Sequence, residues 1–243
     1  MSDTDSIKRR GFLSHEIENY SKEYRERYKN VFSICEAKSD AATQILFKTD
    51  MSVFNSTESL PVVASIALWM RCISSCQAAL ILIEKGMIPE AQTLIRTAYE
   101  FLFYSVAGLG NPEVFESLKE GDKHARKIQA ECMKANGKHE LSEEQIKELE
   151  DLAKENLGGK RAIDAFQAAR MAGLTYLYST VYRGMSFISS HPTLASTNAF
   201  FEERGDGFGL TFGPSEKGLE FSVGLIDTCL QHGSTIFDPL LAA

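Results

Sequence analysis

A ten-residue segment with the sequence YRGMSFISSH ends at His191 and carries six polar side chains within an otherwise apolar stretch. At helical spacing, Tyr182, Ser186, Ser189 and Ser190 lie near one side of a helix. Arg183 and His191, with Ser190 at the boundary, lie on an adjacent side. Hydroxyl, guanidinium and imidazole groups can together bind an anion or move a proton, so this helix end is the first candidate site.

Two further apolar stretches also carry polar residues. Arg96 and Glu100 are one helical turn apart and share a face, and Arg71 lies in a third stretch beside Gln77. If Arg71, Arg96 and Arg183 all lie inside a bundle, one glutamate leaves surplus positive charge, which a phosphate or carboxylate would neutralise. The alternative is that Arg96 pairs with Glu100 while the other two arginines extend to solvent.

The histidine also has two interpretations. An ordinary pKa of about 6.5 suits His191 to general acid–base catalysis, whereas at a helix C-terminus before Pro192 it can simply cap the last turn. The candidate catalytic residues are Arg96, Glu100, Ser186 and His191, and the candidate ligand-binding residues are Arg71, Tyr182, Arg183 and Ser190.

No metal or cofactor site is predicted. Cys72 and Cys76 are one helical turn apart but lack a second Cys/His pair at zinc-finger spacing, so they are expected to be small core residues. The chain has no His-Glu-x-x-His motif, P-loop, Rossmann fingerprint or Gly-x-Ser-x-Gly motif.

The elements that must position these residues are mainly helical. We expect an all-α fold, a helical bundle in one domain over residues 1–243, with a charged helical insertion and a small β-hairpin near the C-terminus. The expected helices cover residues 14–48, an αα-hairpin over 57–110, the charged insertion over 112–160, 163–190 and 216–237, and the β-hairpin covers 197–214.

Composition and net charge exclude some classes of function. With 243 residues and a net charge of −7, the chain is not a generic nucleic-acid coat. A polar N-terminus and five scattered cysteines predict a reduced, cytoplasmic protein. The stretch 60–83 is long enough to cross a membrane, but Arg71 at its centre favours a core helix and no membrane contact.

The stretches EAQTLIRTAYEFLFY and YRGMSFISSHPT together resemble the bacterial family called domain of unknown function 5677. The likeness covers roughly residues 60–110 and 174–214. It implies an all-α bundle and places Arg96, Glu100, Tyr182, Ser186 and His191 on signature positions, without implying a known reaction.

The chain is also distantly similar to the helical HEPN ribonucleases of bacterial conflict systems. Their motif places an arginine four to six residues before a histidine, whereas seven residues separate Arg183 from His191 here. The likeness implies that His191 would act on a ribose 2′-hydroxyl or a leaving group, with arginines stabilising the phosphorane.

Two functional hypotheses follow, and the sequence leaves open whether the protein is an enzyme. The first is an anion-recognising pocket in a metal-independent ribonuclease or nucleotide-handling effector of bacterial defence, with RNA or a nucleotide as ligand. The second is a non-enzymatic interaction module, a homo-oligomer packed through its apolar helices. In either case the charged insertion 112–160 is a lid or protein-binding arm, or an insertion without a separate role.

Overall fold

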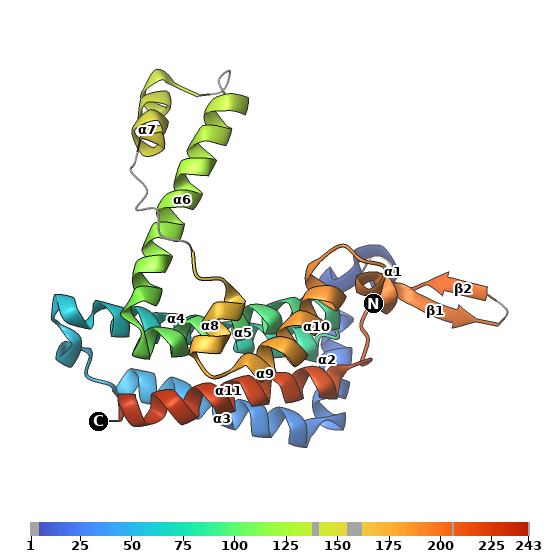
Figure 1. The fold of residues 1–243 in the computed structure, drawn as a ribbon. Helices are drawn as coiled ribbons and strands as arrows, with labels where there is room; N and C mark the ends of the chain where they lie inside the picture. The colour runs from blue at the N-terminus through green and yellow to red at the C-terminus, as the bar shows by residue number, and fades with distance from the viewer. Residues whose placement is uncertain (1–4, 138–140, 155–161, 206, 243) are drawn as a thin grey trace.

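The computed structural model describes residues 5–137, 141–154, 162–205 and 207–242, and confirms the all-α fold with one small β-hairpin. The longer helices form a bundle from which an arm and the hairpin project (Figure 1). The elements in chain order are α1 (Ile7–Arg10), η1 (Gly11–Leu13), α2 (Ile17–Arg27), α3 (Lys29–Lys48), η2 (Met51–Phe54), η3 (Thr57–Ser59), α4 (Leu60–Glu84), α5 (Ile88–Gly110), α6 (Pro112–Asn136), α7 (Glu143–Ala153), α8 (Ala165–Met171), α9 (Thr175–Leu177), η4 (Tyr178–Tyr182), α10 (Arg183–Met185), η5 (Ser186–Ser190), η6 (Ala195–Phe200), β1 (Phe201–Arg204), β2 (Gly207–Leu210) and α11 (Leu219–Leu241).

The centre of the bundle is the predicted αα-hairpin, which the structure confirms as α4 and α5. Gly86 ends α4 with a φ of 72°, a conformation that glycine adopts without a steric penalty. The Met87 N–H then bonds the Leu82 carbonyl at 2.9 Å, which closes the last turn. This turn sends α5 back along α4, so the two apolar helices pack along their length.

Within the described residues, α4 with the short helix before it is the one helical segment long and apolar enough to cross a membrane. Half of its most apolar window is buried inside the protein. It packs against α5, α11 and α3, and also contacts α2 and α6, which makes α4 a core helix of the bundle.

The last helix covers the α4–α5 pair at close range. The Trp69 ring on α4 stacks on Phe237 of α11, with ring centroids 5.4 Å apart and an 8° angle between the planes. Gly233 lies beside the same indole, and a Cβ atom added there would overlap the ring. Glycine is therefore required for α11 to approach α4 this closely.

The predicted single helix over 14–48 is wrong, because the chain breaks at Tyr28. There φ is −108° and ψ is 23°, outside the helical region, and α2 ends while α3 begins. The break lets Arg25 on α2 form ion pairs with Glu36 on α3 and Glu84 on α4.

The charged insertion forms the arm. Helices α6 and α7 pack against each other and extend away from the bundle (Figure 1). Val114 and Ser117 anchor the base of α6 in the bundle, whereas α7 has no buried residue. Ser142 and Gln145 form the predicted capping box at the start of α7.

The predicted continuous helix over 163–190 is also wrong. It breaks at Gly173, where φ is 72°, and it contains two π-helical turns, η4 and η5. Turns of this wider kind are uncommon and frequently lie at functional sites. Here η4 contains Tyr182, and η5 contains the serines of the segment that ends at His191.

The predicted β-hairpin is confirmed as an antiparallel pair. Phe201 lies opposite Leu210, and Arg204 lies opposite Gly207. The pair projects away from the helices (Figure 1). Asp206, at the expected turn, lies outside the described residues.

Candidate functional site

Four of the predicted site residues form one hydrogen-bonded cluster between α5 and the π-helical segment. Arg96 is at its centre: Nη1 donates to Glu100 Oε2 at 2.7 Å, and Nε donates to Ser186 Oγ at 2.9 Å. Its Nη2 donates to the Tyr182 hydroxyl, and the guanidinium lies over the Tyr182 ring at 4.3 Å from the centroid. We call these four residues the Arg96 clasp.

Tyr182 completes the clasp as a neutral phenol. Its hydroxyl donates to Glu100 Oε2 at 3.1 Å while accepting from Arg96. Burial, reinforced by the Glu100 charge, raises the pKa of Tyr182 well above its usual value. The phenol therefore keeps its proton at neutral pH and acts as a hydrogen-bond donor.

The Ser186 hydroxyl donates to none of the basic side chains of the clasp, because Glu100 is bonded by Arg96 and Tyr182 instead. The hydroxyl donates to the Tyr182 carbonyl at 2.9 Å and accepts from the Arg96 guanidinium. A nucleophilic serine needs a basic side chain as proton acceptor at its hydroxyl, whereas the Ser186 hydroxyl proton points to a backbone carbonyl. The clasp thus joins two helical segments, with its one positive and one negative charge balanced.

Of the two arrangements considered for the arginines, the structure has the second, in which Arg96 pairs with Glu100 and the other two arginines reach solvent. Arg71 is exposed on α4, with its guanidinium 5.3 Å from the Phe101 ring centroid, and Arg183 is exposed on α10. Long arginine side chains reach water from an apolar helix, which avoids the cost of a buried charge. Surplus positive charge therefore does not accumulate beside Arg96.

His191 and Ser190 lie outside the clasp. His191 follows the last π-helical turn in an extended conformation and is exposed. The Ser190 hydroxyl is buried and has no hydrogen-bond partner within the described residues. Thr93 on α5 bonds the Ser189 carbonyl at 3.0 Å, so this helix end is tied to α5 at the backbone.

A hollow of about 260 Å³ lies beside the same helix end. Ile88, Pro89 and Gln92 from the start of α5 form one wall, and Ile188 of η5 and Ser196 of η6 form another. None of the eight predicted site residues lines it. The expected pocket shared by Arg96 and His191 is thus not the hollow that forms here.

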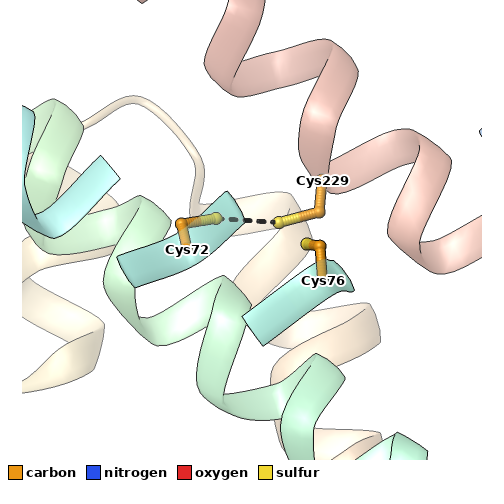
Figure 2. A group of neighbouring side chains, drawn as sticks. All are labelled: Cys72, Cys76 and Cys229. Atoms are coloured by element: carbon orange, nitrogen blue, oxygen red, sulfur yellow. Dashed lines mark hydrogen bonds between the residues drawn. The ribbon is translucent and has the colours of Figure 1, made fainter. Parts of the chain in front are cut away.

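Sequence reasoning missed a second cluster of reactive side chains. Cys72 and Cys76 on α4 and Cys229 on α11 point toward one another (Figure 2), and their sulfur atoms all lie within 4.8 Å of one another. Spacing predicted the α4 pair as core residues, and they are fully buried. The third thiol is 157 residues away along the chain from Cys72, so no local motif could have indicated it.

The comparisons with known proteins identify a family. No curated protein and no solved structure matches the chain significantly. The model of the "Family of unknown function (DUF5677)" matches residues 62–208, a span that contains the whole Arg96 clasp and excludes Cys229. This span is more than half of the 243 residues, and the chain therefore belongs to the DUF5677 family.

Proposed function

We propose that the protein is a non-enzymatic interaction module that self-associates through its β-hairpin. The observation that carries this proposal is an apolar hairpin face that its own chain leaves uncovered. Phe201 and Leu210 are directly opposite in the ladder, and positions two residues apart share a face, so three of the four positions of this face are apolar (Phe201, Phe208 and Leu210) and the fourth is Glu203.

These side chains are unusually open to solvent for their type. Phe208 is 78% exposed and Leu210 is 73% exposed. Phe212 extends the face toward the bundle, where it contacts the rings of Phe12 and Phe200. Contiguous exposed apolar surface of this kind marks association sites in soluble proteins.

A second copy of the chain is the partner that this face fits. A two-stranded hairpin alone is marginally stable in water, and four residues a strand leave little surface to hold it. Two hairpins related by a twofold axis would cover each other's apolar faces with identical residues. Each copy would then bury the apolar hairpin face that the other copy exposes.

The test is the oligomeric state of the purified chain, measured by light scattering after size-exclusion chromatography over a range of concentrations. We expect a dimer for the unaltered chain and a monomer for the double variant Phe208→Asp/Leu210→Asp. The matched control is Phe47→Asp, which replaces an 88%-exposed phenylalanine on α3 and should leave the dimer intact.

Three outcomes would refute self-association through the hairpin: a monomeric unaltered chain, a double variant that remains dimeric, or a control variant that dissociates equally. Circular dichroism of each variant establishes that the helices are intact. A monomer that binds vesicles or another protein through Phe208 would replace the second copy with that partner.

An anion-binding surface is the second candidate function. Within the described residues, Arg183 and His191 are both exposed and make no hydrogen bond or ion pair, so both are available to a phosphate. We choose RNA as the probe because the spacing of Arg183 and His191 suggested a HEPN-like ribonuclease, a suggestion that remains a hypothesis. Binding or cleavage of RNA by the unaltered chain, lost in His191→Ala and Arg183→Ala, would support this candidate, and equal behaviour of all three would remove it.

A further inference from the structure

We infer that Cys72, Cys76 and Cys229 form a binding site for one soft trivalent ion of the arsenite type. This inference is independent of the proposed self-association, because it concerns the interior of the bundle. It follows from the distances between the sulfurs, their burial and the charge that such a site can hold.

The distances fit a single central ion. The Cys72 and Cys229 sulfurs are 3.5 Å apart, and all three sulfurs lie within 4.8 Å of one another. An ion bonded at about 2.3 Å to three sulfurs in a plane holds them about 4.0 Å apart, and a pyramidal arrangement brings them closer. Small side-chain adjustments would therefore bring all three into bonding range.

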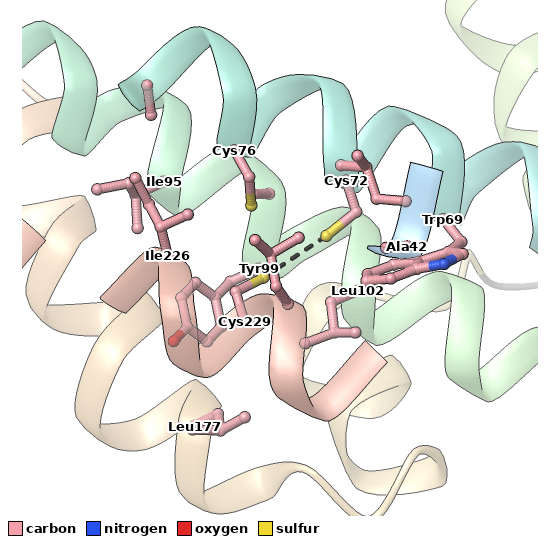
Figure 3. Packing of buried hydrophobic residues seen from close by; sticks show 14 of the residues in the cluster. Ala42, Trp69, Cys72, Cys76, Ile95, Tyr99, Leu102, Leu177, Ile226 and Cys229 are labelled. Carbon is pink, nitrogen blue, oxygen red and sulfur yellow. Dashed lines mark hydrogen bonds between the residues drawn. The ribbon is translucent and has the colours of Figure 1, made fainter. Parts of the chain in front are cut away.

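The surroundings of the three thiols are apolar. Trp69, Tyr99, Leu102 and Ile226 lie around them (Figure 3), and all three cysteines have no solvent exposure. Burial raises the pKa of Cys72 and of Cys229 well above the usual range. The resting site thus holds three neutral thiols in a dry space.

Charge decides which ion the site accepts. Three thiolates leave one negative charge with a divalent ion and two with a monovalent ion, and an unpaired buried charge is costly. Zinc also takes four ligands, and the described residues add no fourth cysteine, histidine or carboxylate to the group. A trivalent ion with three thiolates is neutral and needs no fourth ligand.

The binding reaction balances without an oxidant. Arsenous acid, As(OH)₃, exchanges its three As–O bonds for three As–S bonds. Each hydroxide leaves as water with one thiol proton, so three water molecules are released and arsenic remains trivalent. No charge enters or leaves the core.

Binding would join two helices that are distant in sequence. Cys72 and Cys76 belong to α4, and Cys229 belongs to α11. Because the thiols are fully buried, the ion would enter only when α11 moves away from α4, which predicts slow binding. Once bound, it would stabilise the folded chain, since the unfolded chain does not hold the three sulfurs together.

The experiment uses the full chain with sodium arsenite and a phosphine reductant that does not compete for arsenic. Native mass spectrometry should show a gain of one arsenic less three hydrogens, and X-ray absorption should show three sulfur neighbours. The melting temperature should rise with arsenite concentration. Cys229→Ala should lose the three-sulfur signature, whereas Cys132→Ala, which removes an exposed thiol, should retain it.

The inference is overturned if the unaltered chain binds no arsenic even when refolded in arsenite, or if Cys229→Ala gives the same three-sulfur spectrum. Retention of Zn(II) by the same three thiols would overturn the argument from charge. If Cys229→Ala does not fold, the sulfur count in the unaltered chain and in Cys35→Ala decides the matter, because Cys35 is a buried thiol outside the trio.

Discussion

The Arg96 clasp and the three buried cysteines lie in one bundle, but polar side chains are accommodated in opposite ways at the two places. In the clasp, a guanidinium and a carboxylate are retained as charges, with side chains 21% and 36% exposed, and each nitrogen of Arg96 has a partner. The thiols have no exposure and no charge. Charged groups stay where water still reaches them, and the dry centre holds groups that remain neutral.

The comparison indicates which chemistry each place can support. At the clasp, a ligand would have to displace an existing partner of Arg96 or use its remaining N–H groups. In the centre, only a ligand that adds no charge can bind without a large desolvation cost. Stability and its pH dependence should therefore respond differently to substitutions in the two places.

The largest effect is expected from the close contact that holds α11 over the thiols. Gly233→Ala forces a methyl group into the Trp69 ring, and we expect the free energy of unfolding to fall by about 3 kcal/mol. Urea unfolding followed by circular dichroism measures this change.

Gly224→Ala is the matched control for that substitution. It lies on the same helix, and an added Cβ would meet no atom within 4 Å. We expect it to raise the free energy of unfolding by about 0.5–1 kcal/mol, because alanine favours the helix. Equal destabilisation by both substitutions would show that the close approach of Trp69 is not the reason why residue 233 must be glycine.

An intermediate effect is expected at the clasp. Arg96→Ala removes a partner that Glu100, Tyr182 and Ser186 share, and should cost about 1–2 kcal/mol, because the partly exposed Glu100 can be hydrated instead. Arg71→Ala removes only an exposed guanidinium over an aromatic ring and should cost less than about 1 kcal/mol. A larger loss of stability for Arg71→Ala in the same unfolding assay would contradict our conclusion that Arg96 stabilises the fold more than Arg71 does.

The smallest effect is a pH dependence at the thiols. The folded pKa of Cys72 is raised above its ordinary value of 9.0, so the stability it contributes is present below about pH 9 and is lost as the pH rises further. The unfolded thiol loses its proton first, which favours unfolding. Cys72→Ala should therefore lose stability less steeply than the unaltered chain between about pH 8 and 10.5.

Tyr182 should show a similar pH dependence at higher pH, because its ordinary pKa is 10.0 and its folded pKa is also raised. Because this pKa is raised on folding, as it is for Cys72, the stability that Tyr182 contributes is lost only above about pH 10. Tyr182→Phe should thus change the slope at higher pH than Cys72→Ala does. Identical pH profiles for the two variants would contradict the separate environments that the structure assigns to them.

Local features of the fold were predictable from sequence. Proline in the first turn and Gly86 after the last turn were sufficient to define the α4–α5 hairpin. The break at Tyr28 was not predictable, because apolar residues continue at helical spacing across it. The π-helical turns around Tyr182 were equally hidden, since a wider turn leaves no fixed sequence signal.

The candidate site was predictable where its contacts are local or lie on facing helices. The four-residue spacing of Arg96 and Glu100 indicated their ion pair, and the same spacing placed Tyr182 with Ser186. Whether Arg71 and Arg183 point inward depends on how each helix is rotated in the bundle, which spacing alone does not fix. The three thiols meet only through the tertiary fold.

The position of α11 bears on how this family can be dissected. The matched family span ends at residue 208, yet the surface of α4 that carries Trp69 is sealed by Phe237 and Gly233. A fragment cut at that boundary would present an indole and two thiols to water and would tend to aggregate. Any expression design that isolates the shared segment must therefore carry the C-terminal helix with it.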